Sequence, residues 1–302
     1  MDLPRLGVTL QHFGEHAGPD AIVTVAQAAE RLGFHAVSVS DRLLTPVGPH
    51  WTNDAGLPES APWDALEVLT WAAAHTRRIR LTTAILNTIF QPPVVVARRL
   101  ATLDQLSRGR VVAGVGQGGG TRLAPYYIPE EFTAAGVPAA RRGAGFAEHV
   151  AAMRACWGPD PVEFHGEHYT VPAAKVGPKP YGDRIPVLFG AIARRTVERA
   201  ARIGDGFVTT AVNWDDTRTQ VRWYRDAGGD GTVLVSVFAA PPGTDVGTAD
   251  FVEAALRNLE RAAAVGADEM HIATNLLDVH PQRQADLLEA LASELGLPTD
   301  AH

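Results

Sequence analysis

Residues 79–115 read IRLTTAILNTIFQPPVVVARRLATLDQLSRGRVVAGV, and this stretch decides the fold class. Its first part, residues 79–86, is apolar and rich in β-branched residues, which predicts a buried strand. Helical spacing relates the apolar residues that follow, Val96, Leu100 and Leu103. Gly109 then ends the helix, and residues 111–115 are a second apolar run. A strand, a helix and a strand in this order predict two parallel strands joined by a right-handed crossover.

The same alternation extends over both ends of the chain. Further strands are expected at residues 6–10, 36–40, 187–189, 206–210, 233–238 and 269–273. Further helices are expected from Asp20 to Gly33 and over residues 63–75, 195–202, 217–226, 251–265 and 282–295. Eight strands alternating with eight helices predict an α/β protein folded as a (β/α)8 TIM barrel. An open, doubly wound sheet is the alternative.

The alternation is interrupted after the fourth strand. Residues 116–180 are rich in Gly, Pro, Tyr and His, with one helix expected over residues 143–157. A hairpin is expected from residues 162–164 and 169–171. We therefore expect a single barrel domain over residues 1–302, with a long insertion at about residues 117–180.

Composition limits the classes of function. The chain has 302 residues and a formal net charge of -7, which argues against binding to nucleic acid or to an anionic membrane. Cys156 is the only cysteine, and residues 1–5 do not resemble a signal peptide, so a cytoplasmic protein is expected. No apolar run approaches the roughly 20 residues that span a bilayer. The eleven histidines are scattered, without the spacing of a metal site.

Function in such barrels gathers where the strands end. The predicted ends carry mostly polar residues and glycines: Gln11, His12, Asp41, Arg42, Asn87, Gly116, Gln117, Gly118, Gly190, Thr209 and Thr210. Among the titratable groups, Asp41 is favoured because it directly follows a strand, whereas a single histidine such as His12 or His50 more often has a structural role.

Two glycine-containing motifs could bind a ligand. Residues 114–120 read GVGQGGG, but no helix follows them, so a dinucleotide-binding turn is not indicated and a flexible loop is the alternative. Residues 190–195 read GAIARR and lead directly into a helix. Free amides at a helix start, together with Arg194 and Arg195, suit a phosphate group. The alternative is that both arginines point into solvent.

Several segments together resemble one known family. Residues 28–42 (AAERLGFHAVSVSDR), 78–86 (RIRLTTAIL) and 101–110 (ATLDQLSRGR) carry the resemblance in the first half of the chain. Residues 164–169 (FHGEHY), 177–180 (GPKP) and 203–207 (IGDGF) carry it in the second half. The chain resembles the bacterial luciferase-like monooxygenase family, and within it the branch of oxidoreductases that use the deazaflavin coenzyme F420.

The resemblance implies where a cofactor lies. Members pack a flavin or F420 ring against the third strand, at a strained and often cis peptide bond that corresponds here to Ala84 and Ile85. Gly116, Gln117 and Gly118 would also border the cofactor. Its phosphate would lie against Gly190, Ala191, Ile192, Ala193 and Arg194.

Two departures from the family pattern concern these sites. Members commonly have Gly-Gly-x-Ser at the phosphate site, where this chain has Gly-Ala-Ile-Ala, so Arg194 or Arg195 would have to supply the missing contact. Arg42 stands where many members have a catalytic histidine. Because an arginine stays protonated, it cannot shuttle protons, but it could stabilise a reduced ring or anchor an anionic substrate.

The resemblance therefore predicts hydride transfer between F420 and a small organic substrate, with Asp41 and His12 as acid–base candidates. An FMN-dependent monooxygenase is the first alternative. A barrel that binds its cofactor without turnover is the second. The family's habit of dimerising implies a homodimer.

Overall fold

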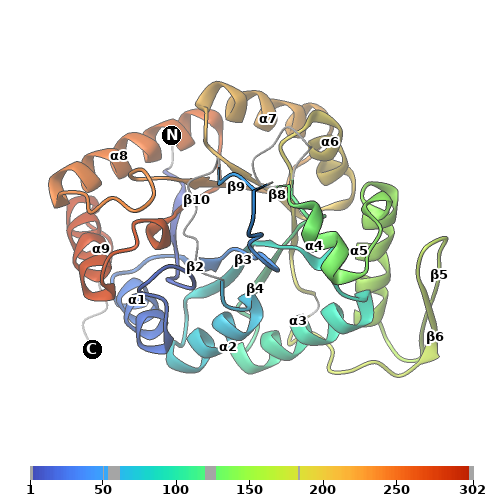
Figure 1. The fold of residues 1–302 in the computed structure, drawn as a ribbon. Helices are drawn as coiled ribbons and strands as arrows, with labels where there is room; N and C mark the ends of the chain where they lie inside the picture. Colours follow the sequence, from blue (N-terminus) through green and yellow to red (C-terminus); the bar gives the residue numbers. More distant parts are fainter. Residues whose placement is uncertain (1–2, 50, 54–61, 120–126, 183, 299–302) are drawn as a thin grey trace.

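A computed structural model describes residues 3–49, 51–53, 62–119, 127–182 and 184–298. Eight parallel strands close into a barrel in the order β1-β10-β9-β8-β7-β4-β3-β2 (Figure 1). Their bounds are β1 Arg5–Thr9, β2 Ala36–Val39, β3 Arg80–Leu86, β4 Val111–Val115, β7 Val187–Gly190, β8 Gly206–Thr210, β9 Thr232–Val237 and β10 Glu269–Ile272. The prediction of a (β/α)8 barrel is confirmed. The open sheet is excluded because β1 pairs with both β10 and β2.

Helices follow the strands and form the outer coat of the barrel (Figure 1). Their bounds are α1 Pro19–Arg31, α2 Ala65–His75, α3 Pro93–Ser107, α4 Pro129–Ala135, α5 Ala144–Trp157, α6 Arg194–Ile203, α7 Trp214–Asp226, α8 Thr248–Val265 and α9 Pro281–Leu295. The short 3-10 helices are η1 Thr88–Phe90, η2 Ala139–Arg141 and η3 Thr274–Leu276. Helix α2 begins later than expected because Asp64 caps it, accepting hydrogen bonds from the amides of Leu66 and Glu67.

The segment between β4 and β7 departs from the regular alternation. It contains α4, η2, α5 and the antiparallel hairpin of β5 (Val162–His165) and β6 (Thr170–Ala174), which lies at the edge of the molecule (Figure 1). Helix α5 packs beside α3 and so takes the fourth helix position of the coat. The shorter helix of the insertion, α4, contacts η1, which follows β3.

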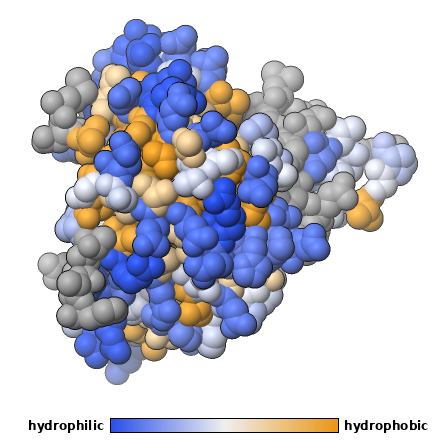
Figure 2. Space-filling view, turned by 90° about the vertical axis from the view of Figure 1, so that its left-hand side faces the viewer, coloured by the Kyte–Doolittle hydropathy of each residue, from blue (hydrophilic) through white to orange (hydrophobic). Residues whose placement is uncertain are grey.

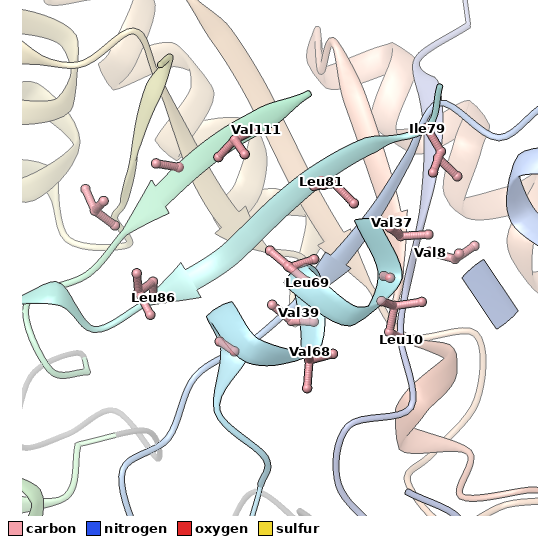
Figure 3. Close-up of a cluster of buried hydrophobic side chains, with 14 of the residues drawn as sticks. Val8, Leu10, Val37, Val39, Val68, Leu69, Ile79, Leu81, Leu86 and Val111 are labelled. Carbon is pink, nitrogen blue, oxygen red and sulfur yellow. The ribbon is translucent and has the colours of Figure 1, made fainter. Parts of the chain in front are cut away.

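The core has two layers. The outer layer lies between strands and helices, where side chains such as Val37, Leu81 and Val111 pack with Leu69 of α2 (Figure 3). The inner layer lies inside the barrel and contains Val112, Leu188, Val208 and Leu234, with Ala84 and Ile85 packed against it. Because the strands are buried on both faces, their sequences are continuous apolar runs. Burial of one such side chain contributes roughly 1.5–3 kcal/mol to folding.

The end of the barrel opposite the strand carboxyl ends is closed by a charged cluster. Glu269 lies 2.9 Å from the Arg5 guanidinium, 3.4 Å from His35 and 3.3 Å from His271. Burial would raise the pKa of Glu269, but hydrogen bonds from His271 and His35 hold it well below its usual range. Gly7 lacks a side chain here because a Cβ atom would stand 2.5 Å from the His271 ring. The cluster therefore closes the amino-terminal end of the barrel and lies far from the carboxyl ends of the strands.

The side of the molecule that carries α8 and α9 shows mainly hydrophilic residues, with hydrophobic ones scattered between them (Figure 2). The helices thus turn their apolar faces toward the strands, as in α9, where Leu287, Leu288 and Leu291 are buried. Within the described part of the chain, no helix has the length and apolar character needed to cross a membrane.

Candidate active site

A cavity of about 310 Å³ opens at the carboxyl ends of the barrel strands. One half of its lining, the glycine wall, follows β3, β4, β7 and β8 and consists of Ala84, Ile85, Asn87, Gly116, Gln117, Gly119, Arg142, Gly190, Ala191, Ile192, Ala193, Thr196, Val208, Thr209 and Thr210. The other half, the aromatic wall, follows β9, β10, β1 and β2 and consists of Ser236, Phe238, Ala273, Asn275, Leu276, Thr9, Phe13, Ser40, Asp41, Arg42, Thr45, Trp51, Asn53 and Pro62. Such a mouth is where barrels of this class bind ligands.

Asp41 has the titration behaviour of a proton acceptor. It lies two residues after the end of β2, and its Oδ2 accepts a hydrogen bond of 2.9 Å from the backbone amide of Asn87. The Asn87 side chain in turn donates to the Asp41 carbonyl oxygen at 3.1 Å. Burial, only partly offset by the Asn87 amide, raises the pKa of Asp41 to about 6. The carboxyl can therefore exchange its proton near neutrality.

Arg42 lines the cavity beside two carboxyl groups. Its positive charge lowers the pKa of Asp41 and also acts on Glu131 of α4. Glu131 is buried, which raises its pKa, and its Oε1 accepts a hydrogen bond of 2.7 Å from the amide of Leu43. Sequence reasoning missed Glu131, because only the fold brings the insertion against the loop after β2.

His12 lies behind the cavity and does not line it. It is fully buried, with Nδ1 donating to the Leu10 carbonyl oxygen at 2.7 Å and Nε2 accepting from the Ser40 amide at 3.3 Å. Burial lowers its pKa to about 4. The ring is therefore neutral near pH 7 and holds Ser40, which does line the cavity, in place. This geometry gives His12 a positioning role in place of the predicted acid–base role.

Ala84 and Ile85 lie at the carboxyl end of β3 and line the glycine wall. The expected cis bond between them is absent: within the described ranges, cis bonds precede only Pro161 and Pro178. The irregularity is instead a shift in the pairing of β3 with β4 between Thr83 and Leu86. A β-bulge re-aims side chains at a strand end, which explains how both residues reach the cavity.

Gly116 and Gly190 make room for the Ile85 side chain. A Cβ atom at Gly116 would stand 2.5 Å from Ile85 Cγ2, and one at Gly190 would stand 2.9 Å from Cδ1. Real Cβ contacts are essentially never that short, so a side chain at either position would displace Ile85 from its place. The result is a shelf formed by Ile85 and flanked by bare backbone on two neighbouring strands.

The loop after β4 divides its residues between two tasks. Gly116 and Gln117 line the cavity, but Gly118 does not. Gly118 has a φ of 79°, and a Cβ atom there would stand 2.5 Å from the Phe132 ring of α4. Its amide donates to Asn87 Oδ1 at 3.2 Å. Gly118 therefore fixes the loop and does not face a ligand, in contrast to the prediction from sequence.

The two arginines predicted to bind phosphate point elsewhere. Arg194 and Arg195 are exposed and do not line the cavity, and Arg194 Nε donates to Glu198 Oε1 at 2.8 Å on the outer side of α6. Direct side-chain compensation for the missing serine hydroxyl is therefore not supported. The side chains face solvent because they occupy the first turn of α6 on its outer surface.

Two residues that sequence reasoning missed line the glycine wall, which those arginines do not. Thr196, in the first turn of α6, lines the cavity, and its Oγ1 donates to the Ala193 carbonyl oxygen at 2.7 Å. Arg142, from the insertion, also lines the cavity, donates to the Gly119 carbonyl oxygen at 2.9 Å and lies 5.0 Å from the centre of the Tyr127 ring. The sequence did contain a signal for Thr196, because this threonine follows Ala193 by three residues and so carries a hydroxyl into the first turn of the helix.

Comparisons with known proteins agree with this geometry. The sequence profile of the family described as luciferase-like monooxygenase matches residues 4–292. An F420-dependent glucose-6-phosphate dehydrogenase from Nakamurella multipartita is 34% identical over 215 residues, which cover 70% of this chain and 58% of the relative. An uncharacterized protein from Mycobacterium tuberculosis is 32% identical over 290 residues, which cover 90% of this chain and 92% of the relative.

Among solved structures, the coenzyme F420-dependent tetrahydromethanopterin reductase from Methanopyrus kandleri has the same fold. Its TM-score is 0.72 at 17% identity, with 97% of this chain and 98% of that chain covered. The match covers 58% of the Nakamurella dehydrogenase, which is less than two thirds of its length. The family profile, in contrast, covers nearly the whole of this chain, from residue 4 to residue 292. This chain belongs to the luciferase-like monooxygenase family.

Proposed function

We propose that this chain is an oxidoreductase that uses coenzyme F420 for hydride transfer to or from a small organic substrate. The observation that carries the proposal is the pairing of the Ile85 shelf with the Asp41 carboxyl, whose pKa is about 6, in one cavity. The relative named as F420-dependent supports the choice of cofactor. We further propose that the protein is cytoplasmic, which agrees with its single cysteine. We also propose that it forms a homodimer, as the resemblance to the family implies.

The residues present fit an aromatic ring with a phosphate-bearing chain. The glycine wall offers the flat apolar shelf of Ala84 and Ile85, flanked by Gly116 and Gly190, on which a ring system can lie. F420, when bound, supplies a ring carbon that gains or loses a hydride. Asp41 would hold or release the proton of the substrate hydroxyl, and Arg42 beside it would stabilise negative charge. Each part of this assignment rests on the placement of these side chains.

The start of α6 suits the phosphate group. No side chain caps this helix, so the backbone amides of Arg194 and Arg195 have no cap partner at its N-terminus. Thr196 and Arg142 lie in the same lining and add a hydroxyl and a positive charge. Burial lowers the pKa of Arg142, but an arginine still keeps its charge near neutrality. We assign phosphate binding to these two side chains and the two amides.

Replacing Arg194 or Arg195 with alanine should change F420 affinity by less than about twofold, because exposed side chains contribute little. Arg142→Ala should weaken binding about ten- to a hundredfold, since charge-assisted contacts are worth roughly 1.5–3 kcal/mol. Thr196→Val should have a smaller effect in the same direction. Fluorescence titrations with F420 at low and high salt measure these affinities. A loss of tenfold or more in Arg194→Ala or Arg195→Ala would overturn the assignment.

The choice of cofactor is tested by titrating the protein with F420 and with FMN in parallel. We expect F420 to bind at least tenfold more tightly, a difference of about 1.4 kcal/mol. A tenfold preference for FMN would favour the monooxygenase alternative and refute the F420 proposal. Tight F420 binding without turnover of any alcohol, aldehyde or ketone in a broad panel would favour a barrel that binds its cofactor without catalysis.

A further inference from the structure

The aromatic wall presents an apolar surface across the cavity from the Ile85 shelf. Phe13, Trp51, Phe238 and Leu276 supply its large side chains. Phe13 is held edge-on by His12, with ring centres 4.5 Å apart, so its orientation does not depend on a ligand. Surfaces of this kind bind apolar ring systems through burial and stacking.

The charges on this wall balance each other. Among its described residues, only Asp41 and Arg42 are charged. The positive charge of Arg42 is directed at two carboxyl groups, those of Asp41 and Glu131. The sequence contains only two lysines, Lys175 and Lys179, and both follow the β5–β6 hairpin region, away from the strands of this wall. A phosphate dianion would therefore meet no excess of positive charge among the described residues here.

Asn275 adds a specific polar group to this apolar surface. It lies in η3, is 2% exposed and lines the cavity, yet its Oδ1 has no hydrogen-bond partner among the described residues. The neighbouring Thr274 hydroxyl donates to the Thr9 carbonyl oxygen at 2.9 Å, which ties η3 to β1. A buried acceptor without a partner is destabilising unless a ligand supplies the donor.

We infer that the substrate of this chain is an uncharged molecule with an aromatic or alicyclic body, one hydroxyl group that reacts beside Asp41 and a second hydroxyl group that donates to Asn275, and that sugar phosphates are excluded. The inference rests on the proposed function only in placing F420 on the glycine wall. It separates this chain from the relative named as a glucose-6-phosphate dehydrogenase, although the two are 34% identical over 215 residues.

The test uses isothermal titration of the F420-loaded protein with 1-phenylethane-1,2-diol and with glucose 6-phosphate. We expect the diol to bind at least tenfold more tightly. Equal or tighter binding of glucose 6-phosphate, or no measurable binding of the diol, would overturn the inference. Loading with F420 is measured first, so that a failure of the proposed function appears as a lack of F420 binding and is distinguished from a wrong substrate class.

The role of Asn275 is tested with Asn275→Leu, which keeps the branched shape and removes the acceptor. The variant should bind 1-phenylethane-1,2-diol at least tenfold more weakly, whereas 1-phenylethanol, which lacks the second hydroxyl, should bind as tightly as before or more tightly. A general packing defect would weaken both ligands to the same degree and would refute the hydrogen bond. Unchanged affinity for the diol would refute it as well.

Discussion

Replacing Asp41 with asparagine should lower kcat/KM of F420-dependent alcohol oxidation by at least a hundredfold. Asparagine keeps the shape and can still accept the 2.9 Å hydrogen bond from the Asn87 amide, but it cannot take up a proton. Loss of a positioned general base typically reduces a rate about 10²- to 10⁴-fold. Steady-state assays that follow the loss of F420 absorbance measure the effect. A variant within fivefold of wild type would show that Asp41 is not the base.

The same carboxyl sets the expected pH dependence. Below pH 6 Asp41 is mostly protonated, because its pKa is raised from 3.8 to about 6. The kcat/KM for oxidation should therefore rise about tenfold per pH unit up to pH 6 and level off above it. In Asp41→Asn this inflection should disappear. A profile with the same inflection in both proteins would assign it to another group.

The substitution should also stabilise the fold at pH 7.5. A raised pKa means that the folded state holds the proton to higher pH than the unfolded state, so the ionised Asp41 lowers the free energy of unfolding as pH rises from about 4 through 6. A tenfold difference in acidity between the two states corresponds to about 1.4 kcal/mol, and after a discount for partial exposure we expect a gain of about 1–2 kcal/mol. At pH 5 the gain should be about half as large, because pH 5 lies midway between the two pKa values, and thermal unfolding at the two pH values checks this.

Replacing Ile85 with glutamate should weaken F420 binding by at least a hundredfold. Ile85 forms the shelf between Gly116 and Gly190, and a carboxylate there would have to lose water against an apolar ring. The side chain is only partly buried, so the fold itself should survive. Fluorescence titration with F420 measures the affinity, and circular dichroism checks that the barrel remains folded.

The matched control is Ile85→Val, which keeps an apolar, β-branched side chain on the shelf. It should bind F420 within about threefold of wild type, because only one methylene is removed. If Ile85→Glu, correctly folded, bound F420 within fivefold of wild type, the ring would have to lie elsewhere in the cavity. The aromatic wall would then be the remaining place for it, and the division of the cavity between cofactor and substrate would be wrong.

Much of the barrel could be predicted from local patterns. The strand expected at residues 111–115 has the same bounds as β4, and the neighbouring strand and helix differ from expectation by only a few residues. Apolar runs and helical spacing are local properties, and a parallel strand buried on both faces cannot be polar. Asp41 could be singled out because a residue that follows a barrel strand lies at the mouth, whereas Ile85 was implied only by the resemblance to the family.

The sequence could not predict what depends on contacts between distant segments. Sequence reasoning assigned His12 an acid–base role, but burial and the Ser40 amide make it a neutral positioning residue. The sequence also predicted that Arg194 binds phosphate, because this arginine begins a helix. The direction of its side chain depends on which face of α6 meets the barrel, and in the structure it points to Glu198.

By itself, the sequence determined the barrel and its mouth, because the period of apolar residues specifies each element and alternation specifies how they connect. Only the tertiary structure decided which groups share the cavity. Arg142 reaches it from the insertion and Asn275 from the other end of the chain. Glu131, also from the insertion, accepts a hydrogen bond from the Leu43 amide and interacts electrostatically with Arg42, which lines the cavity. Charge balance, burial and pKa depend on distances between atoms far apart in sequence, and those distances exist only once the barrel has closed.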